Sequence, residues 1–298
     1  MSIVADVHLG MEKHTRVCVE QEWGVCPSSP DWHCLPAGGA GYGVRDRDTR
    51  YRPDTACGGW RGHVNLSRMK QPVGKWTMPL YPGEAGFVLD MALSRQSGQL
   101  SSYCIDLYAP DDQRRHTGCV VGRARLECDA RDDPPLWHMW LEGREEHENP
   151  TLAPGDFDYA GLSPVPFRFK GAEILIDGSP ATGVEAFALA VQNHVGTGPA
   201  YLGRPAYLVA RNRVVTLELR KVEGEIVLSS AVREARTVSF SATLAHPAGG
   251  SLTFDLPELP VEDSAAAGDP AEPALSSTRL QAGVDQNGVD VQYSIVSA

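Results

Sequence analysis

The chain has 298 residues, of which 42% are hydrophobic and 22% are charged, and its formal net charge is −11. This composition is that of a globular protein and excludes a largely disordered chain. The acidic balance argues against a protein that grips nucleic acid through its phosphates, although the same balance simply keeps many proteins soluble. At roughly 100–200 residues per domain, the length predicts two domains or one large β domain.

The sequence has no feature typical of a membrane protein or of a secreted protein. No apolar run approaches the roughly 18 residues that a bilayer-spanning helix needs. The N-terminal segment contains Asp6 and His8 and lacks the basic start and apolar centre of a secretory signal. We therefore expect a protein that is made and assembled in the cytoplasm and that does not itself bind membranes.

The N-terminal part of the chain has the composition of irregular structure. Residues 37–43 are rich in glycine and residues 45–53 mix Arg with Asp, so both stretches predict a long solvated loop or arm. From residue 60 onward, alternation predicts strands, and one segment has helical spacing. The predicted strands of the first half are residues 60–68, 101–109, 116–129 and 137–141, and the predicted helix is residues 87–93.

A segment rich in acidic residues, proline and glycine, residues 145–166, predicts a linker between the two halves. The second half again shows short alternating strands, with a hairpin turn at Asp177-Gly178 and one segment of helix-like spacing. The predicted strands are residues 167–169, 172–176, 184–195, 213–222, 237–245, 251–256 and 288–296, the helix-like segment is 223–236, and an acidic loop covers 258–273.

Many short strands with turn signals and few helices indicate an all-β protein. We predict two tandem β-sandwich domains, each with a short flanking helix, together with extended loops and arms. The first domain covers residues 1–148 and includes a long N-terminal arm and loop. Residues 149–166 form the linker, and the second domain covers residues 167–298.

Motifs for catalysis or cofactor binding are missing from the sequence. It contains no Gly-x-Ser-x-Gly, no His-Glu-x-x-His and no phosphate-binding loop. The run of Glu145, Glu146 and Glu148 is typical of a solvated surface rather than of a carboxylate pair. We therefore predict a protein that is not an enzyme, with no catalytic residue, no cofactor and no bound metal.

The cysteines are odd in number and occur without a secretory signal, which argues against a disulfide framework. They are Cys18, Cys26, Cys34, Cys57, Cys104, Cys119 and Cys128. A zinc site that uses His14 with Cys18, or His33 with Cys34, is conceivable. Zinc ligands usually come as two tight local pairs, which are missing here, so free packed thiols are the favoured interpretation.

Several short motifs follow one another in a recognisable order. In the second half they are Pro166-Phe167-Arg168-Phe169, Asp177-Gly178, Gln192-Asn193, the strand at 211–222 and FSATLAHPAGGSLTFDLP. In the first half they are GGWRGHVNLSR, Tyr81-Pro82, SSYCIDLYAPDD and HTGCVVGRARLECD. In this order the motifs resemble the two-domain tail tube (major tail) proteins of long-tailed bacteriophages, the siphoviruses. The many cysteines and residues 23–43 depart from that pattern.

The resemblance implies a structural virion protein of the phage tail. In this family, inner strands of neighbouring subunits join into a β-lined channel, and stacked rings form the tube through which the genome is ejected. Two tandem domains imply three chains per ring that imitate six-fold symmetry, with six chains as the alternative. The tape measure protein and genomic DNA pass through the lumen, and a negatively charged lumen would let DNA slide without binding.

One functional surface is expected, a contact between stacked rings. We assign it to the Arg-rich loop at residues 45–57. The contact residues are Arg45, Arg47, Arg50, Tyr51 and Arg52.

Three other interpretations are compatible with the sequence. The first is another tail component of the same fold, such as a tail-tip or tail-terminator subunit. The second is a carbohydrate-binding β-sandwich or a cryptic hydrolase, for which Trp23, Trp32 and Trp60 are candidate platforms that suit core or interface packing equally well. The third is a metalloprotein whose site lies in the first half.

Overall fold

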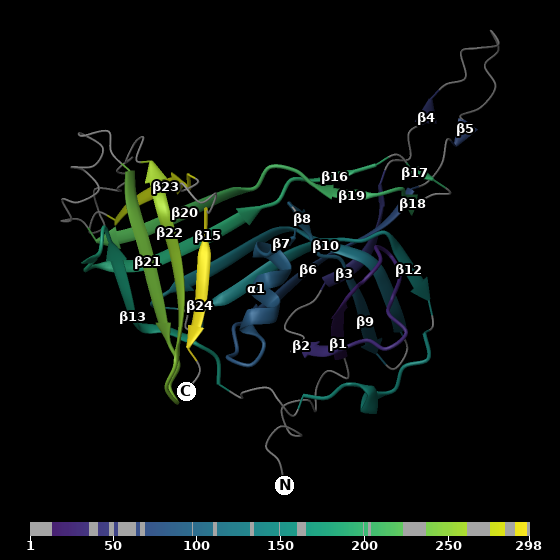
Figure 1. Ribbon diagram of the computed structural model, residues 1–298, viewed down its shortest axis with the longest axis horizontal. Helices are drawn as coiled ribbons and strands as arrows, with labels where there is room; N and C mark the ends of the chain where they lie inside the picture. The colour runs from purple at the N-terminus through teal and green to yellow at the C-terminus, as the bar shows by residue number, and fades with distance from the viewer. Residues whose placement is uncertain are drawn as a thin grey trace.

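The computed structural model describes residues 14–35, 41–47, 51–52, 64–65, 69–96, 98–109, 112–131, 134–148, 150–159, 165–198, 200–201, 204–222, 237–260, 275–283 and 290–296. Within these residues the chain is built of antiparallel strands, with one α-helix, α1 (Ala85–Leu93), and one short 3-10 helix, η2 (Pro154–Asp156) (Figure 1). The predicted all-β class is therefore confirmed.

The first half contains a sheet ordered β2-β1-β9-β10, with β12 on the other side of β10. These strands are β1 (His14–Val19), β2 (His33–Leu35), β9 (Tyr103–Ala109), β10 (Asp112–Asp129) and β12 (Glu145–Glu148). Val17 lies opposite Ile105, and both face the main core. Because neighbouring side chains of a strand alternate between faces, the next opposed pair, Cys18 and Cys104, points to the other side of this sheet.

The strand β10 is 18 residues long and changes its neighbour on both sides. Its first part pairs with β9, whereas residues 123–129 pair with β15 (Val184–Gln192) in the second half of the chain. On its other side β10 pairs first with β12 and then with β11 (Leu136–Glu142). A single strand therefore belongs to the sheets of both halves.

Two irregularities accompany this exchange of neighbours. The register against β9 shifts between His116 and Cys119, where Gly118 has a φ of 64°. A Cβ at Gly118 would lie 2.7 Å from the Cβ of Arg144, so the position requires glycine. The register against β11 shifts at Gly122. Bulges of this kind bend a strand and increase its twist, which turns β10 from one sheet toward the other.

The exchange produces one continuous run of strands, ordered β3-β6-β11-β10-β15-β20-β23, which we call the long sheet. Its remaining members are β3 (Gly41–Arg47), β6 (Met69–Pro79), β20 (Val214–Val222) and β23 (Leu275–Gln281). Within the described part of the chain, β3 pairs only with β6, and β23 pairs only with β20. The long sheet thus spans both halves and has an open edge at each end (Figure 1).

A second sheet, ordered β14-β13-β21-β22-β24, packs against the second-half strands of the long sheet (Figure 1). Its strands are β13 (Arg168–Ile176), β14 (Ser179–Pro180), β21 (Thr237–Ala245), β22 (Ser251–Pro260) and β24 (Gln292–Val296). The ring of Phe240 on β21 meets that of Phe187 on β15, with ring centroids 5.5 Å apart.

Four short ribbons complete the described strands: β4 (Tyr51–Arg52) with β5 (Val64–Asn65), β7 (Arg95–Gln96) with β8 (Gln99–Leu100), β16 (Val195–Thr197) with β19 (Leu208–Ala210), and β17 (Ala200–Tyr201) with β18 (Arg204–Pro205).

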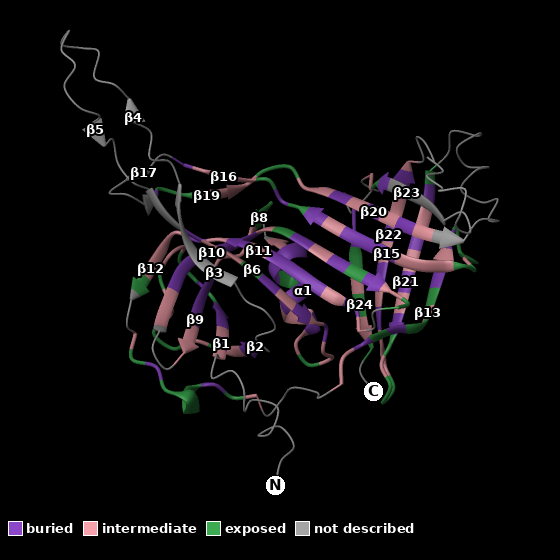
Figure 2. Cartoon of the chain, turned by 180° about the vertical axis from the view of Figure 1, so that it is seen from behind, coloured by how far each residue is buried: buried purple, intermediate pink, exposed green. Residues whose placement is uncertain are grey.

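One hydrophobic core runs through both halves. It includes Trp137 of β11, Phe254 of β22 and most of α1, whose buried residues are Ala85, Val88, Leu89, Met91, Ala92 and Leu93. Figure 2 shows buried segments alternating with more exposed ones along the strands of the long sheet, as expected when one face of a sheet meets a core. The halves are therefore joined by packing as well as by the β10–β15 pairing.

The C-terminal end of α1 is held by two polar side chains from the second half. Asn193 is fully buried, and its Nδ2 donates to the carbonyl of Ala92 at 2.9 Å and to that of Val121 at 3.0 Å. The Arg213 guanidinium donates to the carbonyl of Leu93 at 2.6 Å. A cation at this end also complements the negative pole of the helix dipole.

Several local predictions are confirmed. The helix predicted at 87–93 corresponds to α1, and the strands predicted at 101–109, 116–129, 137–141, 184–195, 213–222, 237–245 and 251–256 correspond to β9, β10, β11, β15, β20, β21 and β22. The predicted Asp177-Gly178 turn joins β13 to β14, and its residues have φ values of 51° and 71°. Asp and Gly are residues that tolerate this left-handed region, as a tight hairpin requires.

Two predictions of irregular structure are wrong. Gly41–Arg47 is not part of a solvated loop, because it forms β3 and pairs with β6. Glu145–Glu148 is not linker, because it forms β12, where Glu146 accepts a hydrogen bond from Arg114. Both are border strands, which backbone pairing holds in place without an alternating apolar pattern. Further along the predicted linker, Leu152 and Phe157 are buried.

Other expectations fall outside the described residues. These are the second helix at 223–236, most of the strand at 60–68 and most of the acidic loop at 258–273. The division into two tandem sandwich domains, 1–148 and 167–298, stays a prediction.

Replacing Asn193 with Ala should lower the free energy of unfolding by about 2–3 kcal/mol, because two buried carbonyls and the Arg95 guanidinium, which donates to Asn193 Oδ1, lose their partner. The neighbouring Gln192 is exposed, so Gln192→Ala should change stability by less than about 0.5 kcal/mol. Urea unfolding of both variants measures the difference. Equal losses would show that Asn193 does not hold the helix end.

Candidate functional site

The long sheet has one face in the core and one face toward solvent, which we call the open face. Along β10, Leu126 and Cys128 are buried in the core, whereas Arg125 and Glu127 point to the open face. On β15 and β20 the open-face positions are Ala186, Ala188, Ala190, Gln192, Thr216, Glu218 and Arg220.

Small side chains on β15 form a shallow groove along the open face. Ala186 lies between Asp129 and Arg220, and Ala188 lies between Glu127 and Glu218. Two hollows of about 370 Å³ and 740 Å³ follow this line of alanines. The groove exists because alanine does not fill the space that a longer side chain on the central strand would occupy.

Ion pairs cross the groove from β10 to β20. The Arg125 guanidinium lies 2.8 Å from a carboxylate oxygen of Glu218 and 2.7 Å from one of Glu127. The Arg220 guanidinium pairs in the same way with Asp129. The Arg125–Glu218 and Arg220–Asp129 pairs join strands that are not neighbours, because β15 lies between β10 and β20. The alanines are what allow these long side chains to meet, and Ala188 is only 8% exposed beneath them.

The pairing shifts the titration of the acidic groups. A hydrogen bond from the Arg131 backbone N–H, together with the Arg220 guanidinium, holds the pKa of Asp129 below its ordinary value. Burial raises the pKa of Glu127, but Arg125 and His138 outweigh burial and keep that pKa below its ordinary value. The carboxylates therefore stay ionised at neutral pH. The open face presents paired charges rather than a field of one sign.

An aromatic residue lies at the first-half end of the open face. The Arg123 guanidinium lies 4.6 Å from the centroid of the Trp140 ring, and the Lys75 ammonium lies 5.1 Å from it. Two cations thus flank this ring, an arrangement stabilised by attraction to its π-system. A phosphate-binding surface would leave cations free for a ligand, whereas among the described side chains of this face Arg125 and Arg220 are engaged with carboxylates and Arg123 lies against Trp140.

The predicted inter-ring residues fall into two groups. Arg45 and Arg47 lie in β3, opposite Gln71 and Met69 of β6. Tyr51 and Arg52 form β4, and Arg50 lies outside the described residues. Two of the five predicted residues therefore lie on the end strand β3 of the long sheet, and two lie on a separate ribbon.

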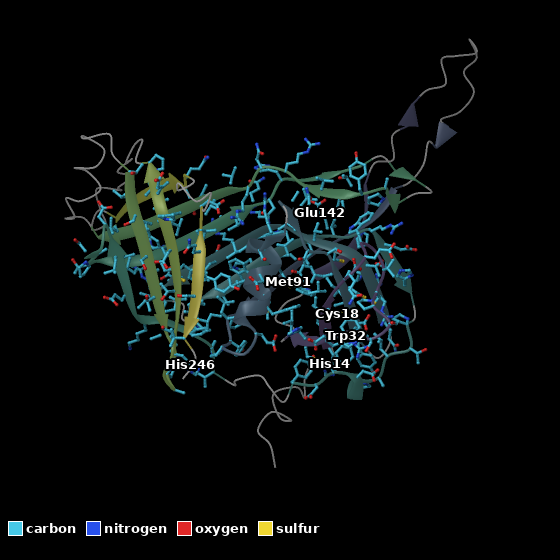
Figure 3. The ribbon with its side chains drawn as sticks, in the orientation of Figure 1. His14, Cys18, Trp32, Met91, Glu142 and His246 are labelled. Atoms are coloured by element: carbon cyan, nitrogen blue, oxygen red, sulfur yellow. The ribbon has the colours of Figure 1, made fainter. Side chains whose placement is uncertain are left out.

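The alternative sites that the sequence offered are also located. Trp23 lies under the Arg144 guanidinium and Trp32 under that of Arg16, at 4.8 Å and 4.3 Å from the ring centroids, so neither presents a bare platform for a sugar. Trp60 lies outside the described residues. His14, which is labelled in Figure 3, stacks on Phe157 with ring centroids 5.3 Å apart.

His33, of the other conceivable zinc pair, stacks on Phe87 with ring centroids 3.8 Å apart, and its Nδ1 lies 3.2 Å from a carboxylate oxygen of Glu84. Among the described residues, the group with metal-ligand spacing contains neither His14 nor His33. It consists of Cys18, Cys26 and Cys104.

Sequence reasoning missed the ion pairs of the open face. The signal was present in the alternating charges from Arg123 to Asp129 and in the alternating alanines of β15. The sequence does not show the strand register. That register places Glu218 and Arg220 of β20 on the other side of the β15 alanines from Arg125 and Asp129 of β10.

No family model matches the chain, and no curated protein is similar to it in sequence. Among the described residues, no helix is both long and apolar enough to cross a membrane.

A double-mutant cycle should show that the alanine groove permits the Arg125–Glu218 pair. With Arg125→Gln and Glu218→Gln, we expect a coupling energy of about 0.5–1 kcal/mol, as for other partly exposed ion pairs. In an Ala188→Leu background the coupling should fall to about zero, because the larger side chain separates the two groups. Urea unfolding measures each corner of the cycle.

The matched background is Ala245→Leu, an exposed alanine on β21 away from the open face. The coupling should persist there. An unchanged coupling in Ala188→Leu would mean that the pair does not depend on the groove.

Proposed function

We propose that this chain is a structural subunit of the tail tube of a long-tailed bacteriophage, which assembles into stacked rings in the host cytoplasm and resides in the virion tail. The observation that supports this proposal is the long sheet, which is continuous across both halves and whose end strands β3 and β23 have no further strand partner in the part of the chain that the structure describes. An open strand edge carries unpaired N–H and C=O groups, which a second chain can satisfy.

Edge-to-edge pairing between copies would close the long sheet into a ring. If β23 of one chain pairs with β3 of the next, every copy makes the same two contacts, and a rotation that closes yields a ring. A closed ring leaves no open edge of this sheet. The resulting wall is a single β-sheet built from all subunits, with the open face on one side and the hydrophobic core on the other.

The width of the long sheet favours three chains per ring. With strands about 4.8 Å apart, its seven strands span about 34 Å, so three copies give a wall about 100 Å around. That corresponds to a backbone diameter of about 32 Å, and side chains reaching about 5 Å inward leave a channel of about 22 Å. This is the order of width of a DNA duplex. Six chains would give about twice the diameter, so the trimer is the preferred assembly.

The open face suits the wall of a conduit for DNA. Of its described side chains, Arg125 and Arg220 are paired with carboxylates, which makes them less available to hold phosphates by counterion release, and Arg123 lies against Trp140. The described part of this wall carries charges of both signs, whereas a negatively charged lumen was expected. In this proposal the tape measure protein and the genome pass along the open face, and ejection depends on weak contact with it.

The experiment that tests this proposal is electron microscopy of the purified chain at high concentration, which should show rings or tubes with a central channel. Particles that stay monomeric at all concentrations would contradict it.

Single prolines on β23 should separate ring closure from folding. Successive N–H groups of a strand point to opposite edges, so the N–H groups of Ser276 and Ser277 lie on opposite edges of β23. Proline removes the N–H group of the residue that it replaces. One of the two variants, Ser276→Pro or Ser277→Pro, therefore loses an N–H on the open edge and keeps the pairing with β20. That variant should keep its circular dichroism spectrum and lose ring formation. Ser294→Pro, on the edge strand β24 of the other sheet, is the control and should still form rings.

Stacking of rings should depend on the predicted inter-ring residues that lie beyond β3. A variant with Arg50, Tyr51 and Arg52 all changed to Ala should form single rings but tubes at least several-fold shorter, because it loses cationic and aromatic contact area. Arg131→Ala, which removes an exposed arginine on a turn, is the control. Normal-length tubes from the triple variant would contradict the assignment of these residues to the contact between rings.

A further inference from the structure

Three cysteines of the first half come together on the side of β1 and β9 that faces away from the main core. Cys18 and Cys104 lie directly opposite each other on these two strands, and Cys26 comes from the loop after β1. Their Sγ atoms all lie within 4.8 Å of one another. Cys18 and Cys104 are 1% and 0% exposed, whereas Cys26 is half-buried. All three are free thiols.

The loop after β1 is built to bring Cys26 back over the strands. A turn between Glu22 and Val25 reverses the chain, with a hydrogen bond of 3.0 Å and a φ of 77° at Gly24. The buried Glu20 carboxylate accepts from the backbone N–H groups of Gly24 and Gly118, each at 2.8 Å. The loop is thereby tied both to itself and to the β10 bulge. The position of Cys26 is set by the fold rather than by chance contact.

Charged groups beside the cluster complement anionic sulfur. Arg16, Asp106 and Arg115 form one row across β1, β9 and β10, with Asp106 fully buried between the arginines at 2.9 Å and 2.7 Å. The row carries one net positive charge. Three thiolates with a divalent ion carry one net negative charge, so cluster and row balance each other.

The same surroundings favour a thiolate at Cys26. The guanidinium groups of Arg115 and Arg16 lie close enough to attract a thiolate at this position. The thiolate is the form of cysteine that binds a metal.

We propose that Cys18, Cys26 and Cys104 bind one thiophilic metal ion, Zn²⁺ or Cu⁺, through three thiolates. Sulfurs around a tetrahedral zinc ion, with bonds of about 2.3 Å, lie about 3.8 Å apart, so the observed spacing needs only a small contraction. Thiolate ligands select these ions over magnesium or calcium. The bound ion would fasten the loop after β1 to both strands. The proposal is independent of tube assembly.

This site differs from the pairs that the sequence offered. It uses neither His14 nor His33, and its ligands are spread from residue 18 to residue 104. The prediction of free packed thiols is the one that the proposal replaces.

The test is a metal titration of the full chain, purified reduced and metal-free. Zn²⁺ and Co²⁺ should each bind at one ion per chain, and Co²⁺ should produce a thiolate-to-metal charge-transfer band. Cu⁺ in a parallel anaerobic arm, with a competing chelator, decides which ion binds more tightly. Thermal unfolding should shift to higher temperature with the preferred ion, because only the folded chain assembles the site.

Cys26→Ser should weaken binding by at least about 100-fold and remove the charge-transfer band. Because Cys26 is half-buried in a loop, this variant should fold normally, which circular dichroism checks. Cys34→Ser is the control, since Cys34 lies on β2 opposite Arg16 but outside the cluster, and it should bind like the unmodified chain. Equal binding by Cys26→Ser and the unmodified chain would overturn the proposal. So would a disulfide between any two of the three cysteines in protein alkylated before purification.

Discussion

The pairing of β10 with β15 is the interaction on which the rest of the structure depends. It joins residues 123–129 to residues 186–192 over seven opposed positions, and it is the only strand pairing in the described chain that links the two halves. Separating the halves would leave two interior strand edges unpaired and would open a core that contains Phe187 and Leu126. The halves are therefore expected to unfold together rather than as independent units.

The same pairing also fixes the chemistry of the open face. Since side chains alternate along a strand, a shift of one residue between β10 and β15 would exchange core and surface positions. In the observed register, Leu126 and Leu189 are opposed in the core, while one position further the alanines lie under the ion pairs. The register between β10 and β15 therefore determines both which side chains pack in the core and which charged side chains pair on the open face.

Much of the fold could be predicted from the sequence because its signals are local. The Asp177-Gly178 turn and the helical spacing of α1 depend on a few neighbouring residues. The strand β3 could not be predicted, since its Gly- and Arg-rich sequence lacks apolar alternation although it pairs with β6. Border strands carry little apolar alternation, so periodicity does not detect them.

The sites were less predictable than the fold because they depend on register between distant segments. Arg125 meets Glu218 only because β15 lies between their strands with alanine at the crossing. Cys18 and Cys104 meet only because β1 and β9 pair in one particular alignment. Neither the Arg125–Glu218 pair nor the Cys18–Cys104 pair can be predicted from the spacing of these residues along the chain. The predicted inter-ring residues, chosen from one local run, were instead divided between β3 and β4.

The central claim is that the open edges of the long sheet close the ring. Hydrogen exchange of the assembled and the monomeric chain, read at the level of β3 and β23, tests it most directly, because exchange reports whether backbone N–H groups are paired. On assembly, about every second amide of each edge strand should become strongly protected, while β24, at the edge of the other sheet, should exchange as before. Rings in which β3 and β23 exchange as fast as in the monomer would contradict the account.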